Sequence, residues 1–317
     1  MPNYDLITAR NIYEEQGFVL LQATTPDGAK NLIEKITNTE NIFSYSEFGL
    51  ANQRVHQAKS DPAKASTFNY GDAPKVPTMF HNEVAYNLKF PKHFSFWMKQ
   101  QAKIGGATLL WDSVKACSEM KQQIPEFWEE YRNGGLVYCT NHPNEEATCG
   151  QEILKSWIGE GINTYSKSLQ ELLGVETIDK LPNTSNQNPN IHFSTTECGI
   201  KKCTHVRGMF NTSFGESCVN HLGIFSPQNF LNYDLMNAKI HPRVVRLKGR
   251  EITQEEWDVI YKIYEKPDFQ HKLSNGELII VNNLRFAHGR TPYSTTDDQK
   301  RQSTIFLYGV VDNSPID

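Results

Sequence analysis

The sequence predicts a mainly β fold with inserted helices, built on a double-stranded β-helix, or jelly roll. Many short strand-like runs separated by turn residues are interrupted by a few amphipathic helical runs. The two motifs that suggest chemistry, around His81 and His288, lie far apart along the chain. A jelly roll interleaves early and late strands, so it is the fold that would bring such distant motifs together.

The chain is long enough to form one large domain with a substantial core. It has 317 residues, of which 38% are hydrophobic. Because no linker-like stretch divides it, we expect a single domain over residues 1–317. The formal net charge is −4 and no long run of Lys or Arg occurs. The composition therefore argues against nucleic-acid and membrane-surface partners.

The N-terminus and the cysteines predict a soluble cytoplasmic protein. No basic segment followed by an apolar core begins the sequence, and no apolar run reaches membrane-spanning length. The six cysteines form no CxxC pair and no regular framework, which predicts reduced thiols. A zinc site that combines Cys198 and Cys203 with His192 or His205 is the alternative, although its spacing fits no standard zinc pattern.

Local signals are clearest in the first part of the chain. Residues 17–22 (GFVLLQ) read as a buried strand. Thr25 and Pro26 then begin a helix, since Thr accepts hydrogen bonds from free backbone N–H groups and Pro has none to lose. Further signals are an alternating strand at 93–98, a turn at Gly105-Gly106, a strand at 107–111 and a helix that Asp112 caps near Val114.

The middle of the chain is the least regular. Residues 151–158 and 163–173 have helical periodicity, which predicts a helical insertion around 140–190. The polar stretch 181–190 is either a mobile lid or a plain surface loop. Strand signals return at 191–194, 204–210, 243–247, 276–281 and 303–311, and a helix with the capping box Thr253-x-x-Glu256 spans 253–265.

The segment Phe80-His81-Asn82-Glu83 is the first candidate metal motif. Side chains two residues apart on a strand point to the same face, so His81 and Glu83 could bind one ion. With His288 as a third ligand they would make the facial triad of non-haem Fe(II) oxygenases. Alone, H-x-E also occurs by chance, and a single histidine is more often a hydrogen-bonded structural residue.

Several segments in the right order give the sequence a wider resemblance. They are GFVLLQ, Arg54, HNEVAYNLKFP, GGATLLWD, Phe210-Asn211, GELIIVNNLRFAHGRTPY and the strand after Arg301. This pattern resembles the taurine dioxygenase-like (TauD/TfdA) superfamily of Fe(II)- and 2-oxoglutarate-dependent oxygenases. It is most similar to the branch with H-x-E ligands, which includes clavaminate synthase and syringomycin-type aspartate hydroxylases. Residues 140–205 do not match clearly.

The resemblance implies a set of cofactors and a role for each matching residue. Fe(II) would be bound by His81, Glu83 and His288, with 2-oxoglutarate and O₂ as cosubstrates. Arg301 and Thr108 would bind the far carboxylate of 2-oxoglutarate, although Arg301 has a surface ion pair as its alternative role. A carboxylate ligand at Glu83 argues against halogenation, because halogenases of this superfamily replace it with a small residue.

The resemblance also implies a small amino-acid-derived substrate in specialised, natural-product metabolism. Hydroxylation is the expected outcome, and oxidative ring closure is the alternative, with desaturation also known in this branch. Candidate substrate contacts, for each of which ordinary packing is an equal alternative, are Arg54, Asn82, Tyr86, Arg207, Asn211 and Arg285. Arg290 is expected to brace His288.

Two other classes of function remain open at this stage. The first is a jelly-roll protein that binds a ligand without oxidising it, for which a missing metal ligand or a missing arginine would be the mark. The second is an oxygenase that acts on proteins, which would often carry accessory domains or strongly charged docking surfaces. The sequence leaves the oligomeric state open.

Overall fold

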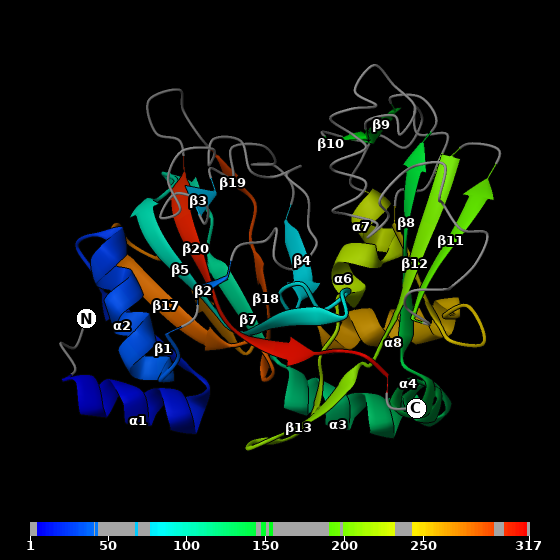
Figure 1. Cartoon of the computed structure of the whole chain (residues 1–317), viewed down its shortest axis with the longest axis horizontal. Coiled ribbons are helices and arrows are strands. Elements are labelled where there is room, and N and C mark those ends of the chain that lie inside the picture. The colour runs from blue at the N-terminus through cyan, green and yellow to red at the C-terminus, as the bar shows by residue number, and fades with distance from the viewer. Residues whose placement is uncertain are drawn as a thin grey trace.

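The computed structural model describes residues 5–40, 42–43, 67–68, 77–143, 147–149, 152–154, 190–196, 199–231, 243–294 and 301–315. Within these ranges the protein is mainly β, with antiparallel sheets and helices packed around them (Figure 1). The expectation of a mainly β fold with inserted helices is confirmed. Arg54, residues 163–173 and most of the 181–190 stretch lie outside the described residues.

Two sheets built from remote strands form the centre of the molecule. The large sheet contains, in spatial order, β1 (Phe18–Gln22), β17 (Glu277–Asn282), β5 (Lys89–Gln100), β20 (Gln302–Asp312) and β2 (Ile42–Phe43), with β3 (Thr67–Phe68) beside β20. The small sheet contains β16 (Phe269–His271), β7 (Thr108–Asp112), β18 (Phe286–Arg290) and β4 (Thr78–His81). Early and late strands are therefore neighbours in both sheets.

Alternate residues of these strands form one hydrophobic core. Phe94 and Met98 of β5, Ile305 of β20 and Ile279 of β17 share a buried cluster with Leu110 of β7. Residues of opposite parity, such as Trp97 and Phe306, belong to another cluster on the outer face of the large sheet. This alternation follows from the two-residue period of a strand.

Two helices, α1 (Leu6–Gln16) and α2 (Pro26–Thr37), cover the outer face of the large sheet. Thr25 caps α2 as predicted, because its side chain accepts a hydrogen bond from Gly28 N and Pro26 occupies the first turn. Ala29, Ile33 and Ile36 then face the sheet and are at most 2% exposed. This strand and helix are therefore framework, with no polar site attached.

A second group of helices packs on the outer side of the small sheet. It comprises α3 (Ser113–Gln123), α4 (Pro125–Gly134), α6 (Leu222–Phe225), α7 (Pro227–Leu231) and α8 (Gln254–Ile263). The predicted capping box of α8 is present, since Thr253 and Glu256 bond each other's backbone N–H groups. Asp112 caps α3 as predicted.

A further four-stranded sheet stands beside α6 in the order β11 (Ile191–Thr196), β12 (Gly199–Val206), β8 (Leu136–Pro143) and β15 (Arg243–Leu247). We call it the third sheet. Short two-stranded pairs complete the described fold: β9 (Ala147–Cys149) with β10 (Glu152–Leu154), β13 (Met209–Thr212) with β14 (Gly215–Cys218), and β6 (Ile104–Gly105) with β19 (Tyr293–Ser294).

Two expectations about local structure are wrong. Helix was expected at 151–158, but its described part, Glu152–Leu154, is the strand β10 paired with β9. One strand was expected at 204–210, but it is interrupted near Gly208, between β12 and β13. There the ring of Tyr131 occupies the space that a Cβ atom would need, and its hydroxyl donates to the Gly208 carbonyl at 2.8 Å.

The expectation of reduced cysteines is wrong for one pair. Cys139 of β8 lies directly opposite Cys203 of β12, with Cα atoms 4.0 Å apart, and the two form a disulfide. The alternative zinc site is excluded too, because the sulfur of Cys203 is already bonded. Cys117 and Cys218 are buried free thiols. A disulfide is uncommon in a reducing cytoplasm, so the redox state of this pair tests the expected location.

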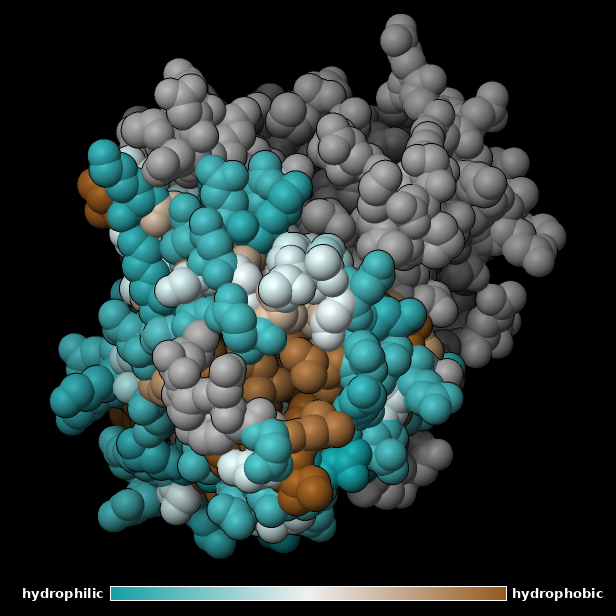
Figure 2. All heavy atoms as spheres, turned by 90° about the vertical axis from the view of Figure 1, so that its left-hand side faces the viewer, coloured by the Kyte–Doolittle hydropathy of each residue, from teal (hydrophilic) through white to brown (hydrophobic). Residues whose placement is uncertain are grey.

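The face formed around α1 and α2 is mainly hydrophilic, with a hydrophobic patch in its lower part (Figure 2). Among the described residues, the exposed large hydrophobic side chains are Leu6, Ile7, Ile104 and Val310. No helix in the described part of the chain is long and apolar enough to cross a membrane.

Candidate active site

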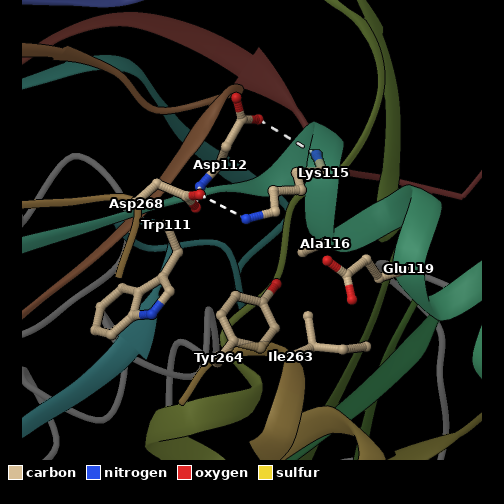
Figure 3. Close-up of a pocket in the computed structure, with 8 residues that line it drawn as sticks. All are labelled: Trp111, Asp112, Lys115, Ala116, Glu119, Ile263, Tyr264 and Asp268. Atoms are coloured by element: carbon tan, nitrogen blue, oxygen red, sulfur yellow. Dashed lines mark hydrogen bonds and ion pairs between the residues drawn. The ribbon is translucent and has the colours of Figure 1, made fainter. Parts of the chain in front are cut away.

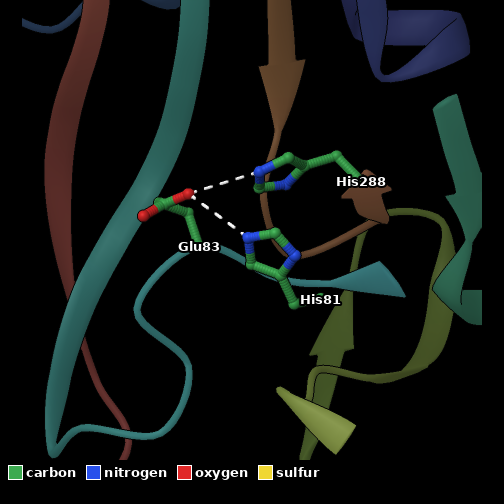
Figure 4. A group of neighbouring side chains, drawn as sticks. All are labelled: His81, Glu83 and His288. Carbon is green, nitrogen blue, oxygen red and sulfur yellow. Dashed lines mark ion pairs between the residues drawn. The ribbon is translucent and has the colours of Figure 1, made fainter. Parts of the chain in front are cut away.

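His81, Glu83 and His288 converge on one point between the two central sheets (Figure 4). Their potential ligand atoms all lie within 4.8 Å of one another. Oε2 of Glu83 is 3.3 Å from Nε2 of His288 and 3.7 Å from Nε2 of His81. Among the described residues this is the one group of His, Cys, Asp or Glu side chains that could hold a metal ion. We call these three residues the triad.

The two histidines meet because their strands are paired. His288 of β18 lies opposite His81 of β4 on one side and opposite Leu110 of β7 on the other. Directly opposed residues project from the same face of a sheet, and Leu110 belongs to the core between the sheets. Both imidazoles therefore point inward, with ring centroids 4.2 Å apart.

Glu83 reaches the same point by a different route from the one predicted. Strand β4 ends at His81, so Glu83 lies in the turn that follows. The side chain of Asn283 holds this turn, since its Oδ1 accepts from Glu83 N at 2.7 Å and its Nδ2 donates to Glu83 O at 3.0 Å. The next residue, Val84, has a φ of 59°, which is strained for a β-branched side chain.

Asn82, which the sequence predicted as a substrate contact, supports the same turn. Its Nδ2 donates to the carbonyl of Asn283 at 2.7 Å, and its Oδ1 accepts from the backbone N–H of Asn220 at 3.0 Å. The residue is fully buried. Its polar atoms are thus used to join the β4 turn to the segments around 220 and 283.

The chemistry of the triad fits a divalent metal. Nδ1 of His81 donates to the carbonyl of Met79 at 2.8 Å, which directs Nε2 toward Glu83. Burial lowers the pKa of His288 to about 4, so this imidazole is neutral at pH 7. Burial alone would raise the pKa of the Glu83 carboxyl, but His288 and His81 outweigh it and hold that pKa well below its usual value. Imidazole and ionised carboxylate are the forms that bind metal.

Aromatic side chains of the large sheet close one side of the triad. The ring of Phe94 lies 4.1 Å from that of His288, and Phe96 lies 5.5 Å from it, measured between centroids. Nδ1 of His288 is buried with no hydrogen-bond partner. The imidazole is therefore held by ring packing, in contrast to His81.

Arg301 and Thr108, the side chains expected to bind 2-oxoglutarate, are both buried. Thr108 is 2% exposed and has the same parity on β7 as Leu110. Arg301 is 6% exposed, and its Nη1 lies 3.5 Å from the hydroxyl of Ser303. Burial makes the alternative role, a surface ion pair, a poor description of Arg301. The nearby Gly106 has a φ of 76°, and a Cβ there would lie only 2.9 Å from Gln101 Oε1, so this turn requires glycine.

Two arginines proposed as substrate contacts have structural roles. Arg285 pairs with Asp112 at 3.2 Å and lies over the ring of Phe214. Arg207 donates to the backbone carbonyls of Ser314 and Asp312. These partners tie chain segments together, and the substrate role of both side chains stays a prediction.

The other predicted site residues differ in how near they lie to the triad. Asn211 is exposed on the β13–β14 hairpin, opposite Glu216, and has no contact with the triad. Tyr86 lies near the triad, because its ring is 4.8 Å from that of His221. Arg290 donates to the hydroxyl of Thr78 at 3.3 Å. It thus joins β18 to β4 instead of bonding to His288.

His221 is a site residue that the sequence did not reveal. It is 6% exposed, and its ring centroid lies 4.6 Å from that of His81. Its Nδ1 donates to the carbonyl of Asn82 at 2.8 Å, and its backbone N–H donates to the hydroxyl of Tyr138 at 2.7 Å. No motif surrounds it in the sequence, so only the fold identifies it.

A small pocket elsewhere in the fold is separate from the triad. It lies between β7, α3 and α8 (Figure 3). Its charges are mostly paired within the protein, since Lys115 contacts Asp268 at 2.9 Å and Asp112 contacts Arg285 at 3.2 Å. Because no triad residue lines it, we assign it to the framework.

Comparison with known proteins shows the family of the chain. A sequence model described as "Taurine catabolism dioxygenase TauD, TfdA family" matches residues 6–193. This is more than half of the chain, and it includes His81, Glu83 and Thr108 but ends before His288 and Arg301. No curated protein matches the sequence.

Two solved structures from Burkholderia xenovorans have a similar fold. One is a taurine dioxygenase, with a TM-score of 0.50 and 12% identity over 99% of this chain and 84% of that chain. The other is a putative alpha-ketoglutarate-dependent taurine dioxygenase, with a TM-score of 0.46 and 14% identity over 99% of this chain and 86% of that chain.

Two histidines and one carboxylate are the ligand set of non-haem iron dioxygenases. The chain belongs to the TauD/TfdA family. Members of this family are dioxygenases that use Fe(II), 2-oxoglutarate and O₂, and these are the cofactors of this chain.

Proposed function

We propose that the protein is an oxygenase of the H-x-E branch that abstracts hydrogen from a small amino-acid-derived substrate and hydroxylates it in natural-product metabolism. The observation that carries the proposal is the convergence of His81 on β4 and Glu83 in the turn after it with His288 on the remote strand β18, with potential ligand atoms within 4.8 Å of one another. The family supports the chemistry, and the substrate class rests on the resemblance to the H-x-E branch. We also propose that the two central sheets form a jelly roll.

Each polar residue of the site takes one role in this proposal. His81, Glu83 and His288 would hold Fe(II). Arg301 and Thr108 bind the far carboxylate of 2-oxoglutarate, because a guanidinium can donate two parallel hydrogen bonds. Fe(II), 2-oxoglutarate and O₂ together supply the oxidation that breaks a substrate C–H bond. The protein residues fix which C–H bond lies nearest the metal.

The same site is compatible with oxidative ring closure, because both outcomes begin with removal of a hydrogen atom. Mass spectrometry of the product separates them: hydroxylation adds one oxygen atom, whereas ring closure removes two hydrogen atoms. A non-catalytic ligand-binding role would be marked by a missing metal ligand or a missing arginine, and the sequence has His81, Glu83, His288 and Arg301.

Release of succinate from 2-oxoglutarate tests the proposed function. With Fe(II), O₂ and amino-acid-derived compounds, we expect one or more compounds to accelerate release by the wild-type protein. His81→Ala and Glu83→Ala should abolish release and retain the circular dichroism spectrum of a folded protein. His192→Ala, at an exposed position of β11, and Glu126→Ala, at an exposed position of α4, are matched controls that should keep full activity. Turnover at the wild-type rate by either triad variant refutes the proposal.

A further inference from the structure

The third sheet stands across α6 from the triad. Helix α6 packs against β4, which carries His81, and against β15 of the third sheet (Figure 1). His221 precedes α6 and contacts His81 with its ring. Its backbone N–H donates to the hydroxyl of Tyr138 on β8. One face of the third sheet, the face that carries Tyr138, is therefore directed toward the metal centre.

This inner face changes from apolar to basic along its strands. Leu136, Tyr138, Val206, Val245 and Leu247 lie on it and belong to the hydrophobic core around α6. Two residues further along the strands, the same face carries three residues side by side: Lys202 of β12, Thr140 of β8 and Arg243 of β15. Directly opposed residues on neighbouring strands share a face. A Lys and an Arg thus flank one Thr, just beyond the apolar part.

This basic row lies one step along the inner face from Tyr138, whose hydroxyl accepts a hydrogen bond from the backbone N–H of His221. Burial lowers the pKa of Lys202 to about 8, which leaves it mostly protonated at pH 7. A guanidinium group is a permanently charged donor in proteins. The row is therefore suited to a ligand with a negative charge.

His221 adds a hydrogen-bond acceptor between this basic row and the metal centre. Its Nδ1 carries the proton that is donated to the Asn82 carbonyl. In a neutral imidazole the other nitrogen, Nε2, is then an acceptor. An amine or ammonium group is the complementary donor.

We propose that Lys202 and Arg243 bind a carboxylate of the substrate while Nε2 of His221 accepts a hydrogen bond from its amino group. The substrate class is then an acidic amino acid or a derivative of one, held between the third sheet and the triad. His221, Lys202 and Arg243 are positioning residues for the reaction. The inference rests on the proposed function and deepens it.

The test compares L-glutamate with its neutral isostere L-glutamine. Protein with saturating Fe(II) and 2-oxoglutarate is titrated anaerobically with each amino acid, and the change in the visible absorption of the metal chelate gives a dissociation constant. We expect L-glutamate to bind roughly tenfold more tightly or better, because charge-assisted hydrogen bonds are about twice as strong as neutral ones.

Matched variants on the two faces of the same strands test which face binds the carboxylate. Lys202→Met and Arg243→Gln should each weaken L-glutamate binding by roughly tenfold and leave the affinity for 2-oxoglutarate unchanged. Lys201→Met and Arg246→Gln change the neighbouring positions on the opposite face and should bind L-glutamate as the wild type does. His221→Ala should reduce binding of both amino acids, because both have the same amino group.

The possible failures differ from one another. Absence of the chelate absorption itself means that the proposed function is wrong. If the chelate forms but L-glutamate does not perturb it, or L-glutamine binds equally well, the acidic substrate class is wrong. If the preference for L-glutamate survives in both Lys202→Met and Arg243→Gln, these residues do not bind the carboxylate.

Discussion

Asn283 fixes the position of Glu83 through its main chain. It bonds both the N–H and the C=O of that residue, and its Nδ2 also donates to the carbonyl of Pro91 at 2.7 Å. The turn after β4 has a strained residue, Val84, so it needs such support. Residues that orient a metal ligand usually matter nearly as much as the ligand itself.

Replacing Asn283 with Ala should therefore lower the affinity for Fe(II) by about 10–100-fold, because Glu83 is no longer held toward the histidines. Anaerobic calorimetric titration with Fe(II) measures the dissociation constant. Asn283→Asp keeps the acceptor for Glu83 N–H and should lose less affinity. Asn211→Ala, exposed on β13, is the control. A folded Asn283→Ala protein with the wild-type dissociation constant contradicts this role.

His93 makes the stability of the fold sensitive to acid. It is 4% exposed beside Tyr13, and its pKa is lowered by burial, and further by the charge of Lys92, from 6.5 to about 3. Between these values the unfolded chain binds a proton that the folded chain does not. The free energy of unfolding is thus at its full value above pH 6.5 and falls as the pH drops toward 3, by up to roughly 5 kcal/mol from this group.

Urea denaturation between pH 7.5 and pH 4 measures this loss. His93→Gln cannot titrate, so the stability advantage of the wild type over the variant should shrink as the pH falls. An advantage that is constant with pH shows that His93 does not bind its proton differently in the folded and unfolded states.

For single residues, the sequence predicted which side chains form the triad but not all of the contacts that position them. His81, Glu83 and His288 converge, but strand pairing accounts only for the histidines, and Glu83 depends on Asn283. The support from Asn283 and the contact from His221 depend on pairing between remote segments. A single sequence carries no signal for such pairing.

Among the secondary structure elements, those with local signals could be predicted. Thr25, Asp112 and Thr253 begin helices as expected, because a capping side chain bonds backbone groups two or three residues away. The helix predicted at 151–158 is wrong at β10, because three residues are too few to show the periodicity of a strand. Its conformation comes from pairing with β9.

The disulfide between Cys139 and Cys203 joins β8 to β12 in the third sheet. It closes a loop with a sequence separation of 64 residues, so the chain-entropy estimate of its contribution to stability is about 4 kcal/mol. We expect Cys139→Ser with Cys203→Ser to lower the free energy of unfolding in urea by roughly 2–4 kcal/mol.

Reductant provides the control for this prediction. Dithiothreitol should destabilise the wild type to about the level of the double variant and should change the variant much less. Equal stability of oxidised wild type and double variant contradicts a structural role for the disulfide. Mass spectrometry of thiols alkylated in intact cells shows whether the pair is oxidised where the protein works.

For the whole molecule, the arrangement of sheets explains why a site can form from such distant residues. β4, β7 and β18 are neighbours in the small sheet, and β5, β17 and β20 are neighbours in the large one. The separation of the motifs predicted that remote strands must meet. It could not predict the third sheet, whose strands β11 and β12 lie largely in residues 140–205, where the family resemblance is not clear.

The central claim is that the triad, Arg301 and Thr108 together bind Fe(II) and 2-oxoglutarate. Anaerobic titration of the purified protein with both, followed by visible absorption spectroscopy, tests it most directly. The account predicts a weak absorption band from the metal–2-oxoglutarate chelate, which is lost in Glu83→Ala and needs much more 2-oxoglutarate in Arg301→Gln. Bound iron with no such band at saturating 2-oxoglutarate would contradict the account.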